Sequence, residues 1–117
     1  MSGEGSELKV LKLDLTSLTA LSQSVGASEL LNCILDKLGI EPAIILAVDD
    51  EMVTVAPGKI EKGLLVDILR FADYFNFEGK DIRKDERALR WIARKVEANL
   101  IVWVKVGKQD ALAYAKL

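Results

Sequence analysis

Basic side chains at helical spacing are the residues of this chain best suited to chemistry with a partner. Four arginines are spaced by four, three and four residues: Arg83, Arg87, Arg90 and Arg94. On a helix over residues 83–94 this spacing places them on one face. A guanidinium group binds phosphate or carboxylate oxygens two at a time. The row therefore indicates an anionic partner, with Lys105 and Lys108 as further basic residues of the same surface.

Three interpretations of this basic row stay open. It is a solvated face if acids neutralise it, since Glu86 lies four residues before Arg90 and Glu97 three after Arg94. The second interpretation is that the row binds an acidic protein surface, and the third is that it binds along a nucleic-acid backbone. In outline, a basic helix followed by a hairpin over Leu100–Leu117 resembles a winged helix, although the usual short helix before the basic one is missing. The sequence pI of about 5.2 is far from that of typical nucleic-acid-binding domains.

The two tryptophans are the other candidates for contact with a partner. Trp91 is displaced from the apolar stripe formed by Leu89, Ile92 and Val96, and Trp103 lies on the strand face opposite Val102. Tryptophan is enriched among interface anchors and also stacks on nucleic-acid bases. Burial in the core is the alternative for both rings.

The inventory of reactive side chains excludes most enzyme chemistries. The chain has no histidine and one cysteine, Cys33, so it lacks a Ser-His-Asp triad, a Cys-His pair and the usual zinc ligand sets. It also lacks the glycine-rich phosphate-binding motifs. The acidic run Asp49–Glu51 either holds Mg²⁺ or Ca²⁺ or is a solvated turn. We predict no catalytic, cofactor-binding or metal-ligating residue, and no enzyme activity.

The hydrophobic pattern predicts an α+β fold in the order β-α-α-β-β-α-α-β-β, with two hairpins in a largely antiparallel sheet packed by helices. The predicted elements are strand 8–15, helices 18–25 and 28–38, strands 43–48 and 52–56, helix 60–75, the basic helix to about residue 98, and strands 100–106 and 111–117. Leu64, Ile68, Phe71 and Phe75 form the apolar seam of helix 60–75, widened by Leu65, Leu69 and Ala72. Ser28 and Asp81 or Asp85 are predicted caps, and Gly39 and Asn99 predicted stops.

Composition indicates one domain over residues 7–117 after a flexible tail over residues 1–6. Half of the 117 residues are hydrophobic and 29% are charged, which is typical of a globular chain. The polar start and the single cysteine favour a cytoplasmic setting without a signal peptide or membrane span. Scarce Gln and Asn resemble the usage of thermophiles. Residues 1–57 carry a net charge of −6 and residues 58–117 a net charge of +4, which suits association with an oppositely charged surface.

Three classes of function follow. The first is a non-enzymatic protein-interaction or assembly module. In one version of it, copies of the chain form a homo-oligomer through a sheet edge or through the strand face that carries Trp103. The second is a nucleic-acid-binding module that uses the basic helix and the C-terminal hairpin. The third is a metal-dependent hydrolase that uses the acids of Asp49–Glu51. The absence of catalytic side chains favours the first.

Overall fold

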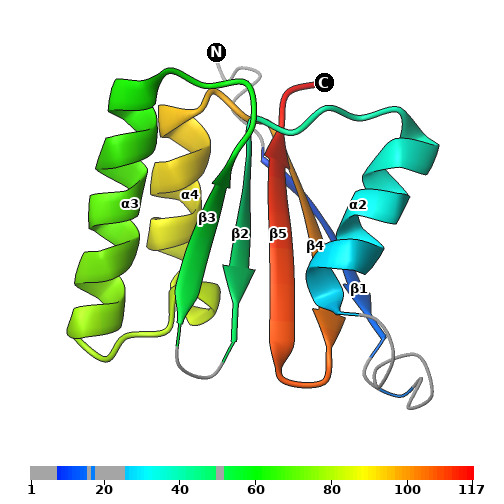
Figure 1. Ribbon diagram of the computed structural model, residues 1–117, viewed down its shortest axis with the longest axis horizontal. Helices are drawn as coiled ribbons and strands as arrows, with labels where there is room; N and C mark the ends of the chain where they lie inside the picture. Colours follow the sequence, from blue (N-terminus) through cyan, green and yellow to red (C-terminus); the bar gives the residue numbers. More distant parts are fainter. Residues whose placement is uncertain (1–7, 16, 18–25, 50–51) are drawn as a thin grey trace.

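A five-stranded mixed sheet forms the centre of the molecule, and helices cover both of its faces (Figure 1). The computed structural model describes residues 8–15, 17, 26–49 and 52–117. In chain order the elements are β1 (Lys9–Asp14), α2 (Ala27–Leu38), β2 (Ile44–Val48), β3 (Val53–Pro57), α3 (Lys62–Phe77), the 3₁₀ helix η1 (Ile82–Lys84), α4 (Glu86–Lys95), β4 (Leu100–Val106) and β5 (Gln109–Ala115). The α+β class is thus confirmed.

The strand order is β1-β4-β5-β2-β3. Only β1 and β4 run parallel, and the other neighbouring strands in this described sheet run antiparallel. The C-terminal pair β4 and β5 therefore lies inside the sheet, flanked by β1 and β2. The predicted helix 18–25, the N-terminal tail and the tip at residues 50–51 lie outside the described residues, so these predictions stay predictions.

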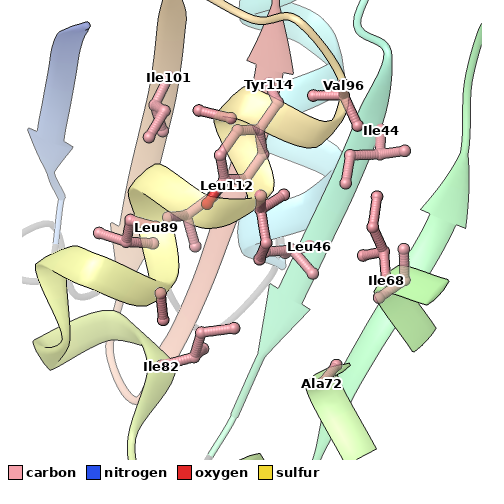
Figure 2. Close-up of a cluster of buried hydrophobic side chains, with 14 of the residues drawn as sticks. Ile44, Leu46, Ile68, Ala72, Ile82, Leu89, Val96, Ile101, Leu112 and Tyr114 are labelled. Carbon is pink, nitrogen blue, oxygen red and sulfur yellow. The ribbon is translucent and has the colours of Figure 1, made fainter. Parts of the chain in front are cut away.

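Strict alternation along β4 divides the core into two layers. Its even-numbered residues point to the side of α2, and Ile101 and Trp103 point to the side of α3 and α4, as the period of two predicted. The α2 side buries Leu31 and Leu35 of the helix against β4 and β5. Figure 2 shows the opposite core, in which aliphatic side chains surround Tyr114. Removal of these side chains from water is the main force that holds helices to sheet.

Capping residues determine where the helices begin and end. Asp85 caps α4, because its carboxylate accepts hydrogen bonds from the backbone N–H groups of Arg87 and Ala88. Gly39 ends α2 at φ 67°, as predicted. Two predicted caps are wrong. The N-cap of α2 is Gly26 rather than Ser28, and the left-handed residue after α4 is Glu97, at φ 56°, rather than Asn99.

Helix α3 begins and ends two residues later than predicted, but its seam is confirmed. Ile68 and Phe75 are buried, and Leu64 and Phe71 pack beside them. Leu69 does not widen this seam: 38% of its surface is exposed, because α3 turns it away from the sheet. Over the described ranges, no helix is long and apolar enough to cross a membrane.

Candidate functional site

The arginine row does not lie on one helix, which corrects the sequence prediction. Asp85 has an extended backbone, at φ −106° and ψ 101°, and caps α4. The helix therefore begins at Glu86, and Arg83 belongs to the separate 3₁₀ helix η1. The physical reason is the cap itself: a residue whose side chain satisfies the first N–H groups of a helix cannot also continue that helix backwards.

Arg83 is held inside the fold by two carboxylates. Its Nε and Nη2 each donate to Asp81 at 2.8 Å, and its Nη1 donates to Asp110 Oδ1 at 2.6 Å. Asp110 is 2% exposed, and its Oδ2 accepts a hydrogen bond from Trp103 Nε1 at 2.6 Å. These contacts lower the pKa of Asp81, chiefly through the hydrogen bonds from Arg83. They also raise the pKa of Arg83, chiefly through its hydrogen bonds to Asp81. Arg83 therefore forms ion pairs with both Asp81 and Asp110.

The other three arginines share the outer surface of α4. The Arg87 side chain is 94% exposed, and its Nε lies 3.8 Å from Asp85. Arg90 pairs with Glu86 at 2.9 Å across one helical turn, and both side chains stay mostly exposed. Arg94 is exposed and makes no ion pair within the described part of the chain. Exposed pairs of this kind contribute little stability, so these guanidinium groups remain available to a partner.

A groove of about 1040 Å³ runs along this side of α4. Its aromatic part is formed by Phe71 and Trp91, whose rings stack at 4.1 Å, with Phe75 packed 4.8 Å from Phe71. Its lining contains five basic side chains: Lys80, Arg87, Arg90, Arg94 and Lys116. The lining also contains two acidic side chains, Asp85 and Glu97. The described groove is therefore positive and partly apolar.

Both tryptophan rings already have partners inside the chain. Trp91 stacks on Phe71 and has the Lys95 ammonium 5.3 Å from its ring centroid. Trp103 lies under the Lys12 ammonium at 4.3 Å and binds Asp110 through Nε1. Each ring is half-buried. Since these contacts occupy the rings, the structure brings Trp91 to the groove but ties Trp103 to the Asp110 cluster.

The remaining predicted basic residues lie apart from the groove. Lys105 is a half-buried residue of β4, directly across from Asp110 on β5. Lys108 is exposed in the two-residue turn between β4 and β5, beside Gly107 at φ 60°. Because β4 and β5 are central strands, they do not project as a wing, and the winged-helix outline is wrong in this respect.

Sequence reasoning missed several residues of the groove. Lys80 precedes η1, Lys116 follows β5, and Phe71 and Phe75 come from α3. The phenylalanines belonged to a predicted core seam, and nothing in their spacing signals that they also line a groove. Only the packing of α3 beside α4 brings these segments together (Figure 1).

Asp49 of the acidic run and Cys33 both lie on the surface, away from the α4 groove. Asp49 Oδ1 accepts a hydrogen bond from the N–H of Met52 at 2.9 Å, as in a turn. Residues 50 and 51 lie outside the described part. Across the residues that are described, no three His, Cys, Asp or Glu side chains gather as a metal site would require. Cys33 is an exposed residue of α2.

No protein-family model matches the chain, and neither a curated protein nor a solved structure matches it.

Proposed function

We propose that this chain is a non-enzymatic protein-interaction module that binds an acidic protein segment along α4. The observation that carries the proposal is the groove, in which five basic side chains and only two acids surround stacked aromatic rings. Arginine and aromatic side chains together are typical of protein interfaces. The exposed arginines supply attraction and orientation, and the apolar part supplies area that a partner can remove from water.

The charge distribution supports an acidic partner. The sequence is acidic overall, with a net charge of −2, so the positive groove contrasts with the rest of the molecule. Arg87 and Arg94 point outward on one helix face, where a carboxylate-bearing segment can reach both. A histidine-free chain with a single thiol has few groups for catalysis near neutral pH, which favours binding as the activity.

Nucleic acid is the alternative partner, and the geometry favours it less. Base stacking needs an open ring face, whereas Trp91 stacks on Phe71 and has the Lys95 ammonium 5.3 Å from its ring centroid. Trp103 is held in the Asp110 cluster. Binding to nucleic acid would then depend on phosphate contacts alone, from a chain whose overall charge is negative.

A direct binding assay tests the proposal. The probes are a fluorescent peptide of alternating Glu and Leu residues, a DNA duplex and a single-stranded RNA, all compared at low and moderate salt. We expect the acidic peptide to bind, and the double variant Arg87→Glu, Arg94→Glu to lose at least about tenfold in affinity, since like charges then oppose each other. Lys37→Glu, an exposed change on α2 with half of the charge change of the double variant, is the control and leaves binding unchanged.

Each outcome decides the proposal. Loss of affinity confined to the α4 variant supports the groove as the binding surface. An equal loss of affinity in Lys37→Glu would mean that net charge causes the loss, and it would contradict the groove as the binding surface. Tighter binding of DNA or RNA than of the peptide would replace the acidic protein by nucleic acid, and no binding of any probe would refute the proposal.

A further inference from the structure

The outward face of α3 carries apolar side chains where a surface helix normally carries polar ones. Phe77 is 87% exposed, the largest exposed fraction among the large hydrophobic residues described, and Tyr74 is 54% exposed. Val66 and Leu69 add 43% and 38% exposure on the same helix. Exposed apolar side chains gathered in a stripe on one helix face mark an interaction surface.

The stripe has the spacing of a helix–helix seam. Val66, Arg70, Asp73 and Phe77 are separated by four, three and four residues, the alternation of a and d positions in a coiled coil. The opposite side of α3, with Ile68, Ala72 and Phe75, is buried against the sheet. Figure 1 shows α3 beside the edge strand β3, so its outward side is open to another molecule.

The two charged residues at the centre of the stripe have no ion-pair partner among the described residues. Arg70 and Asp73 are both exposed, and neither forms an ion pair with any described residue. Apolar residues thus occupy the two ends of the seam and opposite charges its centre. When two copies of the seam run in opposite directions, the apolar ends therefore meet each other and each arginine meets an aspartate.

We propose that the outward face of α3 binds α3 of a second copy of this chain, with the two helices antiparallel. In antiparallel helix pairs an a position packs against a d position of the other helix. Val66 then meets Phe77 of the second copy and Arg70 meets Asp73 of the second copy, and the two-fold axis repeats both contacts. Leu69 and Tyr74 flank this seam on either side.

Charge excludes the parallel arrangement. A parallel pair places each residue against its own copy, so Arg70 would face Arg70 and Asp73 would face Asp73. Like charges held together in an interface repel each other and so reject a wrong geometry. The antiparallel arrangement converts the same four charges into two ion pairs, so a second copy of this chain is complementary to the seam in charge as well as in apolar surface.

The seam and the α4 groove use different residues of α3. The groove is lined by Phe71 and Phe75, and not by Val66, Arg70, Asp73 or Phe77. The two surfaces adjoin at Tyr74, whose ring centroid lies 5.9 Å from the Lys80 ammonium of the groove. Since the seam runs from Val66 to Phe77 on α3, it is about 17 Å long. A contact of that length buries a modest area, so we expect a dimer whose population depends on concentration.

Sedimentation velocity over a wide concentration range tests the dimer by a charge swap. Arg70→Asp alone, and Asp73→Arg alone, each place like charges at the seam and raise the dimer dissociation constant by at least about tenfold. The double variant Arg70→Asp, Asp73→Arg restores the complementary pairs and regains the dimer. Lys37→Asp on α2 is the control and dimerises as the parent chain does. Far-UV circular dichroism verifies that each variant is folded.

A parent chain that stays monomeric at every concentration overturns the proposal. A double variant that stays as dissociated as the single variants overturns it too, because a complementary charge pair then has no part in association. Peptide binding by Arg70→Asp is measured in parallel, so failure of the dimer and failure of the groove are told apart.

Discussion

Replacement of Tyr114 by phenylalanine is expected to stabilise the protein, because the tyrosine hydroxyl is buried without a hydrogen bond. Tyr114 lies on β5 between Ile101 of β4 and Ile44 of β2, and it is fully buried. Its hydroxyl has no hydrogen-bond partner within the described chain. A buried polar group in this state costs about 1–3 kcal/mol of desolvation free energy.

The expected gain follows from two opposing terms. Tyr114→Phe removes the desolvation cost but also loses the dispersion contacts of one oxygen atom, each worth about 0.1–0.2 kcal/mol. The net gain in the free energy of unfolding is therefore about 1 kcal/mol. For a domain of this size that corresponds to a rise in Tm of about 4 °C.

The pH dependence of the free energy of unfolding gives a second test, because the direction of its change can be predicted. Burial raises the pKa of Tyr114 above its ordinary value of 10.0, so the unfolded chain loses this proton before the folded chain does. The parent protein therefore keeps its full stability below about pH 10 and loses it as pH rises above that value, by about 1.4 kcal/mol per pH unit. Tyr114→Phe lacks this loss, so its advantage over the parent grows at alkaline pH.

Urea unfolding followed by tryptophan fluorescence, at pH 7 and near pH 11, measures both effects. Tyr74→Phe is the control, since Tyr74 is 54% exposed and its hydroxyl is solvated. A destabilised Tyr114→Phe at pH 7 would refute the reasoning, because it would show that the hydroxyl has a hydrogen-bond partner in solution. An advantage that stays constant between the two pH values would refute the pKa argument.

Three further substitutions, two of them with a control variant, test the packing and capping of the fold. Asp110→Ala removes the shared acceptor of Arg83 and Trp103 and should lower the free energy of unfolding by about 3 kcal/mol, measured in urea. Glu86→Ala breaks the exposed pair with Arg90 and should lower it by at most about 0.5 kcal/mol. Equal losses would contradict a structural role for the Asp110 cluster. Gly58→Ala should cost about 2 kcal/mol, because an added Cβ lies 2.4 Å from the carbonyl oxygens of Pro42 and Ala43. Gly63→Ala meets no atom within 4 Å and should raise Tm slightly through helix propensity, so a destabilised Gly63→Ala would show that α3 begins differently. Asp85→Ala should lower the free energy of unfolding by about 1 kcal/mol through loss of the α4 cap, and an unchanged value would mean that another group caps the helix.

Local pattern predicted most helices and strands of the described chain, but not the 3₁₀ helix η1 or the start of α4. The even-numbered apolar residues from Leu100 to Val106 predicted the face of β4 that packs against α2, because side chains in a strand alternate between its two faces. The seam from Leu64 to Phe75 predicted the buried side of α3, and Gly39 predicted the end of α2. Each of these signals depends on residues within a few positions of one another.

Tertiary structure alone decided the site. Sequence spacing placed Arg83 in a row with Arg87, but Asp110, 27 residues away, draws Arg83 into a buried cluster, and Asp85 begins a new helix after it. The groove likewise needs α3, α4 and Lys116 to meet. The sequence shows which residues recur at helical or strand spacing, whereas burial and charge pairing depend on contacts between segments far apart in the chain, and those contacts exist only once the sheet has assembled.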